Sequence, residues 1–168
     1  VELMPSILLP MCFFIHAQQK SETGIYFIDS TVIKACHVKR ASSNKVFKGI
    51  AKKSKSTMGW FFGFKLHLLI NDKGEILAFK VTPGTTDDRV PVDKMTQGLT
   101  GKLFGDRGYI SQELFDKLYQ RGLQLITRIK KNVQNKMMPL VDKLLLRKRA
   151  IIESVNDQLK NISQIEHT

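Results

Sequence analysis

Two runs of strand-forming residues joined by a tight turn constrain this chain more than any other feature. The run "WFFGFKLHLLIND" covers residues 60–72, and the run "EILAFKVTP" covers residues 75–83. The Asn-Asp-Lys-Gly sequence at 71–74 lies between them and supplies the glycine that such turns favour. The pattern predicts an antiparallel β-hairpin.

Shorter elements flank this hairpin. Aromatic and β-branched residues predict buried strands at 24–29, 102–106 and 123–129. Capping residues and helical spacing predict a short helix within 85–99 and a helix over 111–122. The order of strand, insertion, hairpin, helix, strand, helix, strand and helix predicts an α/β fold, with a mixed sheet covered by helices.

A longer helix is expected to begin at about residue 139. At roughly 100° per residue, one side of it is mostly apolar and is expected to pack on the sheet. That side comprises Val141, Leu144, Lys148 through its stem, Ile152, Val155, Leu159 and Ile162. The neighbouring polar stripe comprises Arg149, Glu153, Asn156 and Lys160.

The length of 168 residues and the apolar fraction of 42% predict one soluble globular domain with its own core. No stretch reaches the roughly 18 to 20 apolar residues that a membrane span needs, so we expect no membrane partner. We interpret residues 1–23 as the remnant of an upstream segment and residues 24–168 as the domain. Two isolated cysteines favour a reducing cytoplasm.

The formal net charge of +12 is unevenly distributed. Residues 30–71 contain nine basic residues and no Asp or Glu. We interpret residues 38–59 as a basic insertion, and 48–59 within it as a loop that becomes ordered on binding. A positive field attracts polyanions, and nucleic acid is the first candidate.

The expected order of elements places three acids where they could form one site. Asp29 ends the first expected strand, Asp106 ends the fourth, and Glu153 lies on the polar stripe of the last helix. If the two strands are neighbours, the carboxylates converge at one edge and form a site for hard cations such as Mg²⁺ or Mn²⁺. Asp87 and Asp88 are alternative ligands, although capping of the following helix is the better interpretation.

Each acid also has a structural interpretation that the sequence leaves open. Asp29 could cap a turn, Asp106 could pair with Arg107, and Glu153 could bridge to Arg149. The functional interpretation depends on the combination of the three.

Four segments carry a family resemblance. They are "FIDST" at 27–31, the hairpin region at 59–89, "LFGDRGYIS" at 103–111 and "RKRAIIESVNDQLKN" at 147–161. Together they resemble the catalytic domain of DDE transposases from bacterial insertion sequences, a family with the RNase H-like fold. The resemblance implies a mixed five-stranded sheet flanked by helices. It also implies that Asp29, Asp106 and Glu153 are catalytic and hold two Mg²⁺ or Mn²⁺ ions.

The segment around the third acid matches the family pattern with one departure. Many relatives have a tyrosine, an arginine, the glutamate and a lysine at fixed spacing; Arg149, Glu153 and Lys160 fit, and Leu146 replaces the tyrosine. Thr85 stands where relatives commonly have asparagine. The chain ends soon after the catalytic helix, so we expect a domain truncated at its C-terminus.

Side chains expected to contact DNA lie beside the acids, in the basic insertion and before the last helix. They are Arg149, Lys160, His67, Lys45, Lys48, Lys52, Lys53, Lys55, Trp60, Arg128, Lys130 and Lys131. Arg149 and Lys160 would grip phosphates, with helix salt bridges as the alternative, and Trp60 would stack on an end base. For His67, contact with DNA and a hydrogen-bonded place in the core are equally open.

These features predict a transposase that cuts and rejoins phosphodiester bonds at transposon ends. We expect it to bind double-stranded DNA, at transposon ends and target, as a homo-oligomer in a synaptic complex in the bacterial cytoplasm, associated with the nucleoid. Two alternatives stay open: an RNase H-like nuclease without strand transfer, and a DNA-binding protein without turnover, such as a truncated transposase that acts as a repressor.

Overall fold

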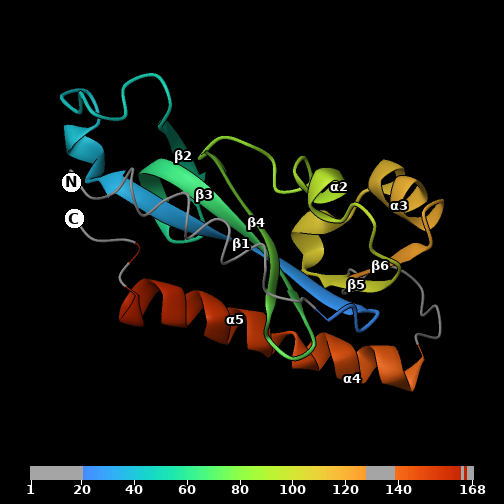
Figure 1. Ribbon diagram of the computed structural model, residues 1–168. Coiled ribbons are helices and arrows are strands. Elements are labelled where there is room, and N and C mark those ends of the chain that lie inside the picture. The colour runs from blue at the N-terminus through green and yellow to red at the C-terminus, as the bar shows by residue number, and fades with distance from the viewer. Residues whose placement is uncertain (1–20, 128–138, 164, 166–168) are drawn as a thin grey trace, which may run out of the picture.

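Two long antiparallel strands form the centre of the sheet. The computed structural model describes residues 21–127, 139–163 and 165 (Figure 1). Strand β1 (Ile25–Cys36) pairs with β3 (Gly59–Asn71) along nearly its whole length, from Tyr26 opposite Asn71 to Cys36 opposite Phe62. The bulge between Lys34 and Cys36 interrupts this register near its end.

The remaining strands pair on either side of these two. Strand β3 forms the predicted hairpin with β4 (Ile76–Pro83), and residues 59–63 of β3 pair with β2 (Lys52–Ser56). On the other side, β5 (Gly101–Gly105) runs parallel to β1 and to β6 (Leu123–Thr127). The order is β2-β3-β1-β5-β6, with β4 on β3, so the predicted hairpin and the two later strands are confirmed.

Helices cover both faces of this sheet (Figure 1). They are α2 (Val92–Met95), α3 (Gln112–Tyr119), α4 (Leu140–Lys148) and α5 (Ala150–Asp157). Because alternate residues of a strand face opposite ways, Tyr26 and Ile28 pack with α2 and α3, whereas Phe27 packs with α4 and α5. The mixed α/β fold is as expected. Within the described ranges, no helix is long and apolar enough to cross a membrane.

The sheet has six strands because part of the basic insertion is itself a strand. The expected loop at 48–59 is wrong for Lys52–Ser56, which forms β2 at the edge of β3. Its alternating lysines and serines carry no apolar pattern, so the strand depends on backbone pairing with β3 and not on burial of its own side chains.

The first strand is longer than expected. Asp29 does not end it, because the β-branched residues that follow continue the pairing with β3 as far as Cys36. Asp29 therefore lies within β1, and its expected position at the end of a strand is wrong.

The helix expected within 85–99 is reduced to the four residues of α2. Before it, the Asp87 carboxylate accepts a hydrogen bond from the Arg89 amide at 2.9 Å, and Asp88 pairs with Lys65 at 3.0 Å. The residue preceding α2 is Pro91, which makes no side-chain capping bond. Capping of this helix by Asp87 or Asp88 is therefore wrong: their side chains stabilise a turn and an ion pair.

The last helix is interrupted at Arg149, where α4 ends and α5 begins. This break changes the phase of the apolar side. Val141 is 61% exposed and Leu144 is 53% exposed, whereas Leu146 is buried. The expected apolar stripe is therefore wrong in α4, because the regular spacing of 100° per residue does not continue through the break at Arg149.

The phase of α4 can be tested with two leucines on the same helix. We expect Leu146→Ala to lower the free energy of unfolding by about 2 to 4 kcal/mol, because it leaves a cavity against β5 and β6. Leu144→Ala should cost less than about 1 kcal/mol. Urea unfolding of both variants measures the difference, and equal costs would contradict this placement of the helix.

Candidate active site

Asp29 and Asp106 lie where two parallel strands separate. Strand β1 pairs with β5 over residues 25–27, and Phe27 stands opposite Phe104 in this register. Asp29 and Asp106 each follow two residues later, on either side of the gap that opens when β5 ends at Gly105. The two strands are neighbours, which is the condition on which the expected convergence of the two carboxylates depended.

The Asp106 carboxylate is held by the turn that follows β5. Its Oδ1 accepts a hydrogen bond from the Gly108 amide at 2.8 Å and thereby caps the 3₁₀ turn η2 (Arg107–Tyr109). A Cβ on Gly108 would lie 3.0 Å from that Oδ1, and one on Gly105 would lie 3.0 Å from the Tyr109 ring. Two glycines therefore allow this tight turn to place the carboxylate at the end of β5.

Arg149 forms ion pairs with both Asp29 and Glu153. Its Nη1 lies 3.4 Å from Asp29 Oδ1, and its Nη2 lies 2.9 Å from Glu153 Oε1. The side chain of Arg149 is 16% exposed, whereas that of Glu153 is 61% exposed. The bridge from Glu153 to Arg149, one of the alternatives left open by the sequence, is present, and it links Glu153 to Asp29.

Asn156 is a second side-chain partner of Asp29. Its Nδ2 donates to Asp29 Oδ2 at 3.1 Å, so each carboxylate oxygen has a partner from the last helical segment. Sequence reasoning placed Asn156 on the polar stripe without giving it a role. A signal was available, since Asn156 lies one turn after Glu153 and beside the apolar stripe, where a polar side chain becomes buried.

Burial and neighbouring charges both shift the pKa of Asp29. Burial is the largest cause that raises the pKa of Asp29, to about 6 from 3.8. The positive charge of Arg149 lowers that pKa, but Asp106 and then Glu153 raise it further. The pKa of Tyr109 is also raised, first by burial and then by the charges of Asp29, Asp88 and Asp106. Asp106 and Glu153 therefore both act electrostatically on Asp29.

The donor set fits a divalent cation in kind and in charge. Carboxylate oxygens are the ligands that Mg²⁺ and Mn²⁺ prefer. The pKa of Asp29 is raised first by burial and to a smaller extent by Asp106 and Glu153, and a bound cation would offset both causes. A cationic group, the guanidinium of Arg149, already lies between Asp29 and Glu153. Within residues 21–127, 139–163 and 165, no three His, Cys, Asp or Glu side chains are grouped closely enough to hold one ion.

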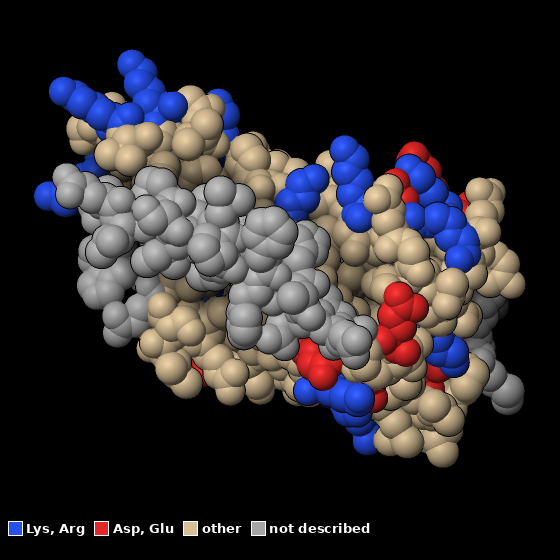
Figure 2. Space-filling model, in the orientation of Figure 1, with Lys and Arg blue, Asp and Glu red and all other residues tan. Residues whose placement is uncertain are grey.

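The lysines of the basic insertion are all exposed. They are Lys39 and the five that are expected to contact DNA, Lys45, Lys48, Lys52, Lys53 and Lys55. Lysine and arginine side chains project from the end of the molecule that carries β2 (Figure 2). Trp60 is 59% exposed and has the ammonium of Lys53 5.3 Å from its ring, whereas Phe61 and Phe62 are buried. The surface needed for contact with a polyanion is therefore accessible here.

Other expected DNA contacts have different outcomes. His67 is fully buried, and its Nε2 lies 2.8 Å from the Thr82 hydroxyl. It is therefore a hydrogen-bonded residue of the core. Burial also lowers its pKa, and we exclude His67 from the DNA-binding set as a correction. Lys160 lies in the helical turn η3 (Gln158–Ile162) and is half-buried. Arg128, Lys130 and Lys131 lie outside the described residues.

Residues 19–168 match a family model described as "Transposase DDE domain". Because the match covers most of the chain, the chain belongs to this family. Family membership and the mixed sheet together confirm the RNase H-like class expected from the sequence.

A solved structure with similarity to the chain is the cryo-EM structure of a piggyBac transposase synaptic complex with hairpin DNA. The sequence identity is 16% and the TM-score is 0.46. The aligned part covers 78% of this chain and 28% of that chain. No curated protein matches the chain.

The raised pKa of Asp29 predicts a pH-dependent cost in stability. Since the folded pKa of about 6 exceeds the unfolded value of 3.8, ionised Asp29 disfavours the folded state. The cost is absent below pH 4 and complete above pH 6. We therefore expect Asp29→Asn, in metal-free buffer, to stabilise the protein at pH 7.5 by up to about 3 kcal/mol and to have little effect at pH 4.

Urea unfolding at several pH values measures this effect. Asp116→Asn on the exposed side of α3 is the control and should shift stability equally little at both pH values. A variant at Asp29 that is less stable than the wild type at pH 7.5 would mean that the pairing with Arg149 outweighs burial.

Proposed function

We propose that this chain is the catalytic part of a transposase that cuts DNA at transposon ends and joins the ends to a target. The observation that carries the proposal is the meeting of Asp29 and Asp106 where β1 and β5 part, with Glu153 linked to Asp29 through Arg149. It is supported by membership of the DDE transposase family.

Asp29, Asp106 and Glu153 are the proposed ligands of two Mg²⁺ or Mn²⁺ ions. Bound divalent cations activate a water or a 3′-hydroxyl and stabilise the leaving oxygen in phosphodiester displacement. Asp29 must lose its proton to act as a ligand, and Asn156 orients its carboxylate. Arg149, released from the carboxylates, would make a bidentate contact with a phosphate beside the scissile bond.

The proposed substrate is double-stranded DNA with transposon ends and a target site. The support is the net charge of +12 and the exposed lysines of the basic insertion. Joining two ends requires their synapsis, so we propose a homo-oligomer in the bacterial cytoplasm, associated with the nucleoid. The division into an upstream segment (1–23) and a domain (24–168), and the origin from an insertion sequence, are part of the same proposal.

Two alternatives share most of these features. A nuclease of this fold would cleave DNA without joining the ends. A DNA-binding protein without turnover would keep the basic surface and lose the metal requirement. An assay with a pre-cut transposon end separates the first alternative from the transposase, because a nuclease gives no joined product.

The proposal predicts metal-dependent cleavage that depends on Asp106. We expect Mn²⁺ to support nicking of supercoiled DNA, and Asp106→Asn to lower the rate by at least about 100-fold, since it removes a ligand charge. DNA affinity in EDTA should stay within a factor of two. Asp116→Asn is the matched control and should retain the wild-type rate. Nicking that survives in Asp106→Asn would contradict the assignment of this acid.

The position of Arg149 between two carboxylates predicts competition with the metal. We expect Arg149→Ala to bind Mn²⁺ about fivefold more tightly in the absence of DNA, equivalent to about 1 kcal/mol of removed cation repulsion. Arg147→Ala removes the same charge from an exposed position on α4 and should change the affinity less. Calorimetric titration measures both, and equal affinities in the two variants would exclude direct competition.

A further inference from the structure

An open pocket of about 510 Å³ lies along β1 immediately beyond Asp29. We call it the β1 pocket; its lining residues are Ser30, Thr31, Val32, Lys34, Lys55, Ser56, Thr57, Met58, Lys65, Asp88 and Lys160. They come from β1, from the β2–β3 hairpin, from the loop before α2 and from η3. The pocket thus connects the candidate active site with the basic insertion.

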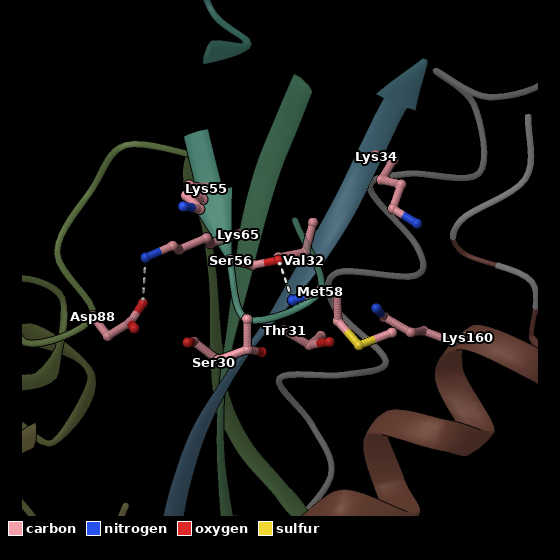
Figure 3. A pocket seen from close by; sticks show the side chains of 11 residues that line it. Ser30, Thr31, Val32, Lys34, Lys55, Ser56, Met58, Lys65, Asp88 and Lys160 are labelled. Atoms are coloured by element: carbon pink, nitrogen blue, oxygen red, sulfur yellow. Dashed lines mark hydrogen bonds and ion pairs between the residues drawn. The ribbon is translucent and has the colours of Figure 1, made fainter. Parts of the chain in front are cut away.

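The lining carries mostly positive charge. Figure 3 shows Lys34 and Lys160 on one side of the β1 pocket in this view, and Lys55 and Lys65 on the other. Asp88 is the one acid among the described residues that line it. A concave surface with four lysines and one aspartate favours an anionic ligand, since its walls concentrate the positive potential.

Hydroxyl groups add directional hydrogen bonding to this charge. The lining includes Ser30, Thr31 and Thr57, and also Ser56, whose hydroxyl already donates to the Gly59 carbonyl oxygen at 3.2 Å. Lysine ammonium groups bind phosphate as compact point charges, and serine and threonine hydroxyls can donate to its oxygens. The polar groups therefore suit phosphate better than an apolar ligand.

Asp88 restrains one of the lysines. The ammonium of Lys65 lies 3.0 Å from Asp88 Oδ1 (Figure 3). It also donates to the Thr86 carbonyl oxygen at 2.9 Å. This pair neutralises part of the positive charge and orients Lys65 within the pocket. Loss of the Asp88 charge would make the pocket more positive without removing any lysine.

The size and direction of the β1 pocket limit its ligand. A volume of about 510 Å³ is within the range of small-ligand sites and is too small to enclose a duplex. From Asp29 to Lys34 the strand rises about 16 Å, at about 3.3 Å per residue. A DNA strand carries several phosphates over that length. One strand that leaves the acids could therefore place consecutive phosphates in the pocket.

We propose that the β1 pocket binds backbone phosphates of the DNA strand that extends from the scissile bond. This inference rests on the proposed function, because it takes the strand to be cut at Asp29 and Asp106. It assigns Lys34 and Lys65 to DNA binding beside Lys55 and Lys160, and it gives the β2–β3 hairpin the role of a wall that holds the strand against β1.

The first test removes a lysine from the pocket. The probe is a labelled duplex with a short single-stranded extension, bound to the full chain in EDTA at several salt concentrations. The logarithm of the affinity falls as the logarithm of the salt concentration rises. We expect Lys34→Ala to make this fall less steep by about 0.7, the value for one single-strand phosphate contact. Lys94→Ala, which removes an exposed lysine from α2, is the matched control and should leave the slope nearly unchanged.

A chemical change in the probe isolates the phosphates. When the extension carries uncharged methylphosphonate linkages, the difference between Lys34→Ala and the wild type should disappear. If the difference persists with the uncharged extension, Lys34 contacts something other than phosphate, and the proposal is wrong.

The second test uses a variant that is expected to bind DNA more tightly than the wild type. A folding defect would weaken binding and therefore cannot imitate this result. We expect Asp88→Asn to bind the extended probe several-fold more tightly, because Lys65 becomes available to a phosphate. The fall of log affinity with log salt should become steeper by about 0.7. Asp87→Asn removes the neighbouring acid, which pairs with Arg89 outside the β1 pocket, and is the control. Equal effects of Asp88→Asn and Asp87→Asn would overturn the assignment of the pocket.

The outcomes separate this inference from the proposed function. If the wild type binds DNA and nicks it with Mn²⁺, yet Lys34→Ala equals Lys94→Ala, the phosphates lie elsewhere and only the inference fails. If the wild type shows neither DNA affinity nor metal-dependent nicking, the proposed function fails and the inference fails with it.

Discussion

The limited parallel pairing of β1 with β5 is the constraint on which the site depends. The two strands share three paired positions and then separate, while β1 stays paired with β3 to its end. The separation leaves Asp29 on a rigid central strand and Asp106 at the start of a glycine-bounded turn. A longer β5 would continue the pairing with β1 past Asp29, and a shorter one would move Asp106 away from Asp29.

The last helical segment balances the charge that this arrangement creates. Arg149 and Asn156 both reach Asp29 from the segment that also carries Glu153. A half-buried carboxylate beside two other acids costs stability, and a guanidinium between them offsets part of that cost. The same guanidinium must move if a divalent cation takes its place. The ion pair is therefore a contact that favours the cation-free state.

The sequence predicted those features that local patterns determine. The β3–β4 hairpin, β5 and β6 follow from apolar runs and turn residues. The convergence of Asp29 and Asp106 was predicted only on the condition that their strands are neighbours, and the pairing of β1 with β5 meets that condition. The extent of β1, the existence of β2 and the phase of α4 did not follow. Pairing with β3 extends β1 and creates β2, and this tertiary contact has no signature in the alternating Lys-Ser sequence. The break at Arg149 likewise lies where the sequence continues a helical pattern, and there Arg149 contacts Asp29.

Anomalous diffraction from crystals grown with MnCl₂ tests the central claim most directly. The account predicts a manganese peak within coordination distance of the carboxylates of Asp29 and Asp106, with the Arg149 guanidinium displaced from Asp29 and Glu153 nearby. The contrary result is a peak bound elsewhere, or none, with Arg149 still between Asp29 and Glu153 at saturating Mn²⁺. In that case the three acids form a structural ion-pair cluster and not a metal site.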